Sequence, residues 1–169
     1  MANPDTAMIE ILARHLNPAL DMIEKLIDGC PDGLWNASGS AGSGPAPVWL
    51  HLYHALVGID FWFRSSKEEA FQFPTFGKAV DPDLSKCSRD FLSKEEIRAC
   101  LKRAREKADA YAEAARRDGL SSTWPFSDTF TCADTFLMQI RHLQHHVGFC
   151  NCALSSKGAA AAAWMGYGE

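Results

Sequence analysis

The sequence lacks the features that would assign it to several large functional classes. Its 17 Lys and Arg residues are outnumbered by 21 Asp and Glu residues, which gives a net charge of −4. Phosphate contacts need clustered basic side chains, so nucleic-acid binding is not expected. No stretch approaches the roughly 18 apolar residues of a membrane span. The N-terminal residues MANPDTAMIEILARHL have no basic segment before an apolar core. They do not resemble a signal peptide, and we expect a cytoplasmic protein.

Two familiar catalytic motifs and a disulfide framework are also missing. No G-x-S-x-G nucleophile motif occurs, and GSAGSG lacks the Lys and the preceding strand of a phosphate-binding loop. The six cysteines have irregular spacings, and in a cytoplasmic chain reduced thiols are expected. The chemistry of the protein must therefore come from other residues.

Strand-type alternation is nearly absent, and segments with the helical period of 3.6 dominate. They predict four long helices, over residues 4–28, 47–65, 94–118 and 132–156. Pro18 predicts a kink or break near Leu16 in the first. Ser93 with Glu96 predicts a capping box before the third helix, which should stop at Gly119.

The connections complete the prediction of an all-α, four-helix bundle. A Gly/Ser/Pro-rich, flexible loop precedes the second helix. Residues 66–92 form a long crossover between helices two and three, which lets those two helices lie parallel. We expect a bundle over residues 1–156 and a C-terminal tail over residues 157–169. The Ala-rich tail is expected to dock through Trp164.

Three histidines lie close together in the stretch RHLQHHVGFCNCAL. On an ideal helix, residues four apart differ by about 40°, so His142 and His146 share the edge of the core face. His145 should face outward. Two histidines at this spacing can bind one metal ion, although the same pattern also occurs in ordinary core helices.

The second helix adds His51 and His54 on a mostly apolar segment. Gly58, one turn after His54, would leave room beside an imidazole. Burying four imidazoles without a shared purpose is costly. One of these two histidines, with the pair from the last helix, would make a three-histidine site with an open position, as in catalytic zinc sites.

Two segments, HALVGIDFW and HLQHHVGFCN, resemble the DinB-like superfamily, and residues 4 to about 156 can be laid on its pattern. The resemblance implies a four-helix bundle in up-down-down-up order and a divalent metal ion, zinc or nickel, held by His54, His142 and His146. One departure is Phe149-Cys150, where the family commonly has Gln-Leu. His51 could compete with His54 or support it, and the Cys150 thiolate could be a fourth ligand or only a small buried residue.

Relatives in this superfamily include thiol-dependent transferases and isomerases. The resemblance therefore implies a metal-dependent thiol transferase or hydrolase that acts on a small-molecule substrate with a low-molecular-weight thiol. The alternative is a non-catalytic metal-binding or stress-associated bundle. Either form could act as a homodimer.

Overall fold

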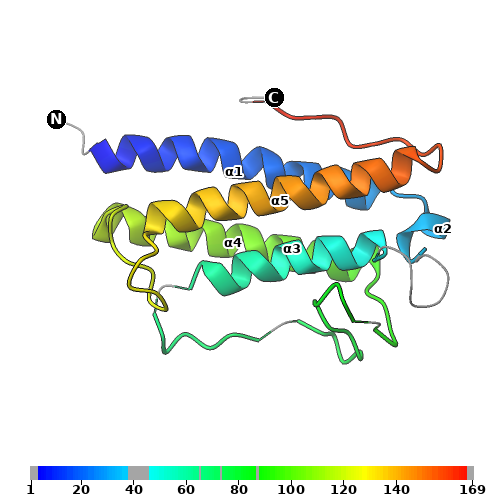
Figure 1. Ribbon diagram of the computed structural model, residues 1–169, viewed down its shortest axis with the longest axis horizontal. Helices are drawn as coiled ribbons and strands as arrows, with labels where there is room; N and C mark the ends of the chain where they lie inside the picture. The colour runs from blue at the N-terminus through cyan, green and yellow to red at the C-terminus, as the bar shows by residue number, and fades with distance from the viewer. Residues whose placement is uncertain (1–3, 38–45, 65, 73, 87, 167–169) are drawn as a thin grey trace.

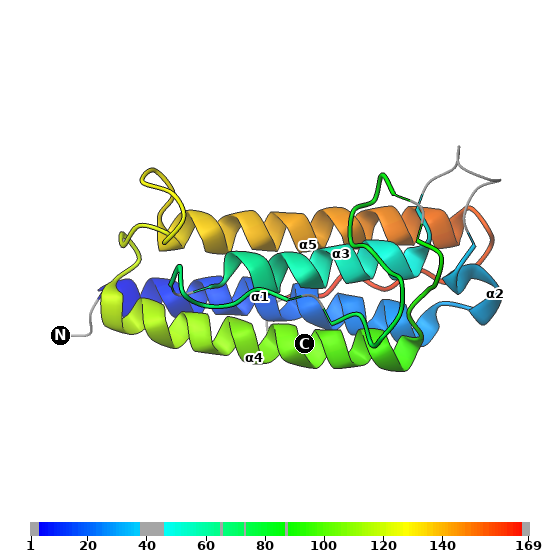
Figure 2. The same cartoon turned by 90° about the horizontal axis from the view of Figure 1, so that it is seen from below.

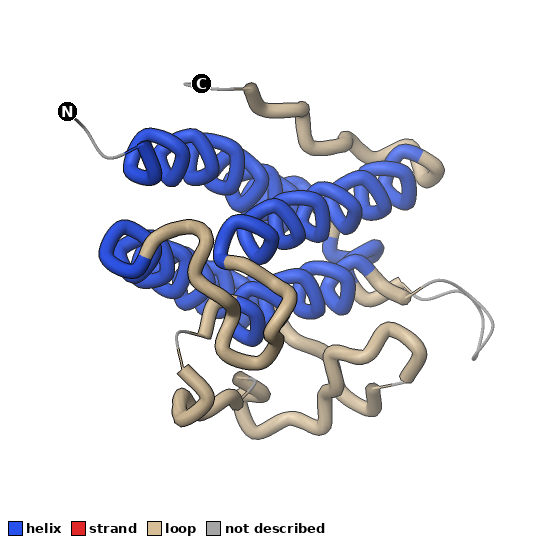
Figure 3. The backbone as a smooth tube through the Cα atoms, turned by 60° about the vertical axis from the view of Figure 1, so that its left-hand side comes forward, coloured by secondary structure: helices blue, strands red, loops and turns tan. Residues whose placement is uncertain are grey.

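The computed structural model describes residues 4–37, 46–64, 66–72, 74–86 and 88–166. In these ranges the chain is all-helical, and its only β-type pairing is an isolated bridge between Thr123 and Thr131 (Figure 3). The helices are α1 (Pro4–Gly29), α2 (Asp32–Trp35), α3 (Val48–Trp62), α4 (Lys94–Asp118) and α5 (Cys132–Ser155). The all-α prediction is confirmed, and the one-turn α2 was not predicted. The Gly/Ser stretch of the predicted loop, residues 38–45, lies outside the described residues.

The four long helices pack side by side around one core (Figures 1 and 2). α1 contacts α4 and α5, and α3 contacts the same two helices, so the four form a closed ring. The colours in Figure 1 show α1 and α5 running in one direction and α3 and α4 in the other. The long segment between α3 and α4 carries the chain back along the bundle, so α4 can run in the same direction as α3. None of the described helices is long and apolar enough to cross a membrane.

The helix ends follow the capping patterns of the sequence. Ser93 accepts a hydrogen bond from the Glu96 backbone N–H, and the Glu96 carboxylate accepts one from the Ser93 N–H. Thr131 and Asp134 form the same reciprocal pair before α5. Gly119 ends α4 with φ of 89°, a conformation that favours glycine. Local sequence therefore fixes where α4 and α5 begin, and with them the register of the histidines on α5.

A kink or a break was predicted near Leu16, and the break is wrong, because α1 continues as one helix through Pro18 to Gly29. Leu16 and Leu20, on either side of the proline, are buried in the core. α1 also packs against α4 and α5. Burial on both sides of Pro18 compensates for the backbone hydrogen bond that the proline cannot make.

The prediction that the tail docks through Trp164 is also wrong. Trp164 is 73% exposed. The tail is held instead by Asn151 on α5, whose side-chain amide donates to the Ala162 carbonyl and accepts from the Ala162 N–H, at 3.0 and 2.8 Å. Ala159, Ala162 and Met165 of the tail also pack against the core.

An ion pair joins α3 to α4 close to the site described below. The Asp60 carboxylate accepts hydrogen bonds from Nε and Nη2 of Arg103 at 3.0 and 2.9 Å. The Asp60 side chain is only 9% exposed, whereas that of Arg103 is half-exposed. A two-pronged contact of this kind fixes the rotation of α3 against α4.

Candidate metal centre

Three histidines from two helices converge inside the bundle. His54 comes from α3, and His142 and His146 come from α5. One ring nitrogen from each can be chosen so that all three lie within 4.8 Å of one another. Their rings meet edge to face, with centroids 4.7–5.0 Å apart. The structure therefore brings together the three residues that the sequence resemblance singled out.

His54 is oriented by the crossover that follows α3. Its Nδ1 lies 2.9 Å from the carbonyl oxygen of Pro82. A carbonyl only accepts hydrogen bonds, so the proton of a neutral His54 is on Nδ1. The lone pair is then on Nε2, which is free to bind a cation. This is the usual way in which a protein fixes the tautomer of a metal-binding histidine.

His146 lies between two other imidazoles. Its Nε2 is 3.0 Å from Nε2 of His142, and its Nδ1 is 3.0 Å from Nδ1 of His51. His51 is itself buried and stacks on Phe149, with ring centroids 3.8 Å apart. If Nε2 of His146 binds a cation, its proton is on Nδ1 and donates to His51. His51 thus contacts His146 and does not belong to the three-residue cluster.

The absence of a side chain at Gly58 leaves room for the imidazole of His142. A Cβ added at Gly58 would lie 2.8 Å from Cε1 and 3.0 Å from Nδ1 of His142, and 3.4 Å from Oε1 of Gln139. The sequence predicted that Gly58 makes room for an imidazole. This imidazole belongs to His142 on α5 and not to His54 on α3, because the two helices approach each other closely at Gly58.

Burial favours the neutral form of His142, His146 and the neighbouring His51, because it lowers the pKa of each. It lowers the pKa of His142 to about 4, with the nearby His54 as the next cause. It lowers the pKa of His146 to about 3, with His142 and His54 adding to the effect. The pKa of His51 is about 4 for the same reason. At neutral pH these rings carry lone pairs, which is the form in which imidazole binds metal ions.

The residues fit a divalent transition-metal ion. Nitrogens bound to one tetrahedral zinc ion at about 2.0–2.1 Å lie about 3.3 Å apart, and the two Nε2 atoms of His142 and His146 are 3.0 Å apart. For this pair a movement of a few tenths of an ångström would suffice, and the three candidate ligand nitrogens together lie within 4.8 Å of one another. Nδ1 of His142 and Oε1 of Gln139 are buried without hydrogen-bond partners. A donor set of three imidazoles suits zinc or nickel better than calcium or magnesium, which prefer oxygen.

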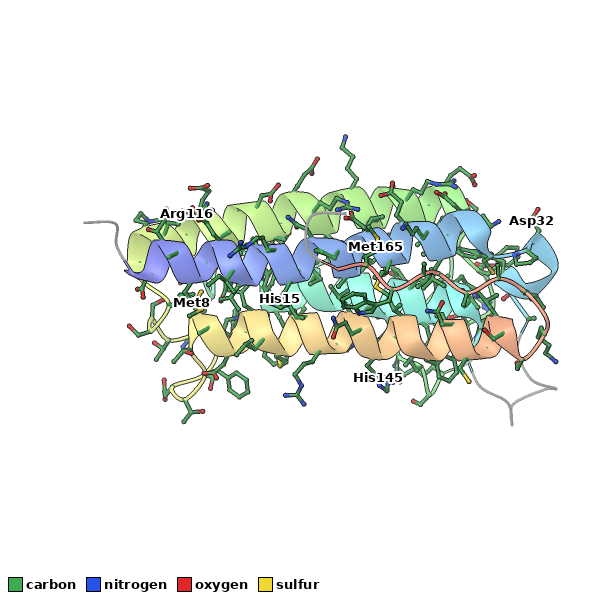
Figure 4. All side chains as sticks on the ribbon, turned by 90° about the horizontal axis from the view of Figure 1, so that it is seen from above. Met8, His15, Asp32, Arg116, His145 and Met165 are labelled. Carbon is green, nitrogen blue, oxygen red and sulfur yellow. The ribbon has the colours of Figure 1, made fainter. Side chains whose placement is uncertain are left out.

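Cys150 and His145, which are close to the histidine pair in the sequence, lie outside the three-residue cluster. Cys150 is completely buried, and burial raises its pKa to about 12, so it is a protonated thiol. This supports the interpretation of Cys150 as a small core residue. His145 is exposed and points away from the bundle (Figure 4), as its helical position predicts.

A pocket of about 500 Å³ opens beside the cluster. His54, Gly58 and His142 contribute to its lining, as do aromatic side chains of α3 and of the segment after it. Pro82, which holds His54, also lines it. A small molecule entering the pocket would reach two of the three converging imidazoles.

Sequence reasoning missed two contributors to the site. Pro82 acts through its backbone carbonyl, which carries no sequence signal. Gln139 is one turn before His142 on the same helix, and a buried amide on the histidine face could have been singled out on spacing. Both belong to the surroundings of the imidazoles and not to the cluster itself.

Comparison with known proteins agrees with this structure. The family model of the DinB superfamily matches residues 15–150, which include all three converging histidines and the four long helices in large part. Searches of curated proteins and of solved structures found no match. The extent of the family match shows that this chain belongs to the DinB superfamily.

Proposed function

We propose that the protein is a metal-dependent enzyme, of the thiol-transferase or hydrolase type, with a divalent ion held by His54, His142 and His146. One observation carries the proposal: three imidazoles converge, two of them line an open pocket, and no fourth His, Cys, Asp or Glu of the described residues joins them. A catalytic zinc site has three protein ligands and one position for a small molecule, whereas a structural site is closed.

When bound, a zinc or nickel ion would supply Lewis acidity that lowers the pKa of a thiol or of water. The protein contributes the rest. Pro82 and His51 fix the rotation of His54 and His146, so that their Nε2 atoms face the same point. An apolar group that covered the aromatic lining of the pocket would displace water there, which strengthens electrostatic interactions.

In the proposed transfer, the thiol loses its proton to solvent through the open pocket. Its sulfur then forms a bond to an electrophilic carbon of the substrate. The leaving group departs with the electron pair of the broken bond and takes up a proton. In the hydrolase form, water replaces the thiol and the electron count is the same. The chain offers no carboxylate within the histidine cluster, in the part that the structure describes, to act as a general base.

Metal analysis tests the site. The wild-type protein should bind one zinc or nickel ion per chain, and His142→Ala and His146→Ala should each lose it. His145→Ala is the matched control, because this exposed histidine on the same helix should leave stoichiometry unchanged. Retention of metal by both inward variants would rule out the assignment.

Activity is tested by loading the protein with zinc or nickel and supplying low-molecular-weight thiols with a chlorodinitroarene, or an activated ester with water. Turnover should require the metal and be lost in His142→Ala but not in His145→Ala. Stoichiometric metal without turnover on any pair would favour the alternative, a non-catalytic metal-binding or stress-associated bundle.

We also propose an up-down-down-up order of the helices, a cytoplasmic location and a homodimer. The up-down-down-up order is supported by the colour gradient in Figure 1. A cytoplasmic location is supported by the free thiols of the five described cysteines, which suit a reducing compartment. A homodimer is supported by exposed Phe130 and Leu137 at the start of α5, which a second copy could cover. Sedimentation velocity would test the dimer.

A further inference from the structure

We infer that the pocket beside His54 and His142 selects a small molecule with a flat, uncharged apolar group, and that it disfavours a carboxylate there. The inference rests on the proposed function in taking the metal end of the pocket as the reacting end, and it names the class of substrate. The inference is carried by the residues of the pocket walls other than the histidines.

One wall of the pocket is aromatic and already ordered. Phe61 and Trp62 come from the last turn of α3, and Phe71 comes from the segment after it. Phe61 meets Phe71 edge to face, with ring centroids 5.0 Å apart and planes at 79°. Phe61 meets Trp62 in the same way, at 5.2 Å and 82°. Flat apolar groups fit such walls, because edge-to-face and offset contacts add to the gain from burial.

Trp62 is held in place from behind. Its ring packs on that of Trp124 with centroids 4.6 Å apart, and Nε1 of Trp124 donates to the Trp62 carbonyl at 2.8 Å. Trp124 is buried, whereas Phe61, Trp62 and Phe71 are half-buried. The half-buried rings keep apolar surface that a ligand could cover. Because the wall is pre-organised, a ligand does not lose affinity by having to order it.

The charges at the pocket are negative. Asp81 and Asp83 also line it, and hydrogen bonds from Lys86 and Ser85, respectively, are the main causes that lower the pKa of each carboxyl. Nζ of Lys86 lies 2.8 Å from an Asp81 oxygen and 3.7 Å from an Asp83 oxygen. One ammonium group thus serves two carboxylates, and it does not line the pocket.

A second cation nearby is not available to a ligand either. The Arg64 guanidinium lies 4.3 Å from the ring centre of Phe61 and 3.9 Å from that of Phe126, and its Nε donates to the Phe61 carbonyl. Arg64 is buried and does not line this pocket. A carboxylate entering the pocket would meet two like charges, and no Lys or Arg lines the described pocket to pair with it. An aryl or alkyl group would meet rings.

The test compares three ligands that share a metal-binding head. Zinc-loaded protein is titrated at about pH 8, where imidazole is mostly neutral, with imidazole, with phenylimidazole substituted on carbon, and with imidazoleacetate. Amide NMR spectra follow the Gly58 backbone and Trp62 indole signals, which report on the pocket directly. Burial of one phenyl group should make phenylimidazole bind about tenfold or more tighter than imidazole. Imidazoleacetate should bind no tighter than imidazole.

Variants assign the effect to the wall. Phe71→Ala should remove most of the preference for phenylimidazole, whereas Phe126→Ala, in the same aromatic cluster but outside the pocket lining, should keep it. Asp83→Asn should strengthen binding of imidazoleacetate. Equal binding of imidazole and phenylimidazole, or strongest binding of imidazoleacetate, would overturn the inference.

A metal-free arm separates this inference from the proposed function. In protein stripped of metal, benzyl alcohol should shift the Gly58 and Trp62 signals, and benzoate of nearly the same shape should shift them less. If zinc does not bind, the proposed function fails while this arm still decides the class of ligand. If zinc binds but benzyl alcohol and benzoate behave alike and the ligand series shows no preference, only the inference fails.

Discussion

Gly58→Ala is expected to damage metal binding far more than it damages the fold. The substitution places a methyl group 2.8 Å from Cε1 and 3.0 Å from Nδ1 of His142. Real Cβ atoms essentially never approach so closely, so the imidazole must move. It cannot move and keep its ligand position, because metal sites tolerate distance errors of only about 0.2 Å.

Two effects on stability oppose each other. Replacing glycine by alanine inside a helix stabilises by about 0.5–1 kcal/mol. Overpacking a filled interior costs about 1–3 kcal/mol. The metal-free variant should therefore be less stable than the wild type by about 0–2.5 kcal/mol, and it should fold. The zinc affinity, in contrast, should fall about tenfold to a hundredfold, as for other disturbances around metal ligands.

Gly148→Ala is the matched control. Gly148 is also inside a helix, two residues after His146, and an added Cβ there would meet nothing within 4 Å. This variant should gain about 0.5–1 kcal/mol of stability from helix propensity and keep the wild-type zinc affinity. Urea unfolding of the metal-free proteins gives the stabilities, and competition with a chromophoric chelator gives the affinities. Unchanged zinc binding in Gly58→Ala, or equal losses in both variants, would refute the reasoning.

Three further variants separate supporting residues from ligands and test the helix packing. His51→Phe keeps a ring beside Phe149 but removes the nitrogen next to His146. Chelator competition should therefore show about tenfold to a hundredfold weaker zinc binding at unchanged stoichiometry. Loss of stoichiometry would instead show that His51 is a ligand. Cys150→Ala should keep full zinc stoichiometry by metal analysis and lose about 1 kcal/mol of stability as a small cavity forms; loss of metal would show that the thiol is a ligand. Arg103→Ala leaves the Asp60 carboxylate without its two-pronged partner and should cost about 1–3 kcal/mol in urea unfolding, part of which Asp60→Asn should restore; an unchanged midpoint would contradict the role of this ion pair.

Local signals in the sequence were sufficient to predict the four long helices and to predict which histidines of α5 face the core. The capping residues Ser93 and Thr131 mark helix starts because their hydroxyls satisfy backbone N–H groups within the same turn. Once α5 begins at Cys132, helical geometry alone separates buried His146 from exposed His145. These features depend on neighbours in sequence, so they could be predicted without knowledge of the packing.

Features that depend on distant segments could not be predicted in the same way. The one-turn α2 has a proline before it and no side-chain cap, so its sequence offers little signal. The contact of Gly58 with His142 depends on how closely α3 approaches α5. The hydrogen bond from His54 to Pro82 depends on the path of a segment without regular structure, and any residue could offer the same carbonyl. The three histidines could be proposed from the sequence, but their supporting atoms could not.

The three imidazoles of the cluster differ in the groups that hold them in place. His54 is held by a backbone carbonyl and His146 by the side chain of His51. His142 has no such partner on Nδ1, and the amide oxygen of Gln139 beside the same small space is also unpaired. Leaving a buried donor or acceptor unpaired costs about 1–3 kcal/mol, so a shift that brings these two groups together would be favoured. If Nε2 of His142 binds a cation, its proton lies on Nδ1, and Gln139 becomes the natural acceptor. His142 also lines the pocket. His142, the one imidazole of the three with no hydrogen-bond partner outside the cluster among the described residues, is thus also one of the two that line the pocket.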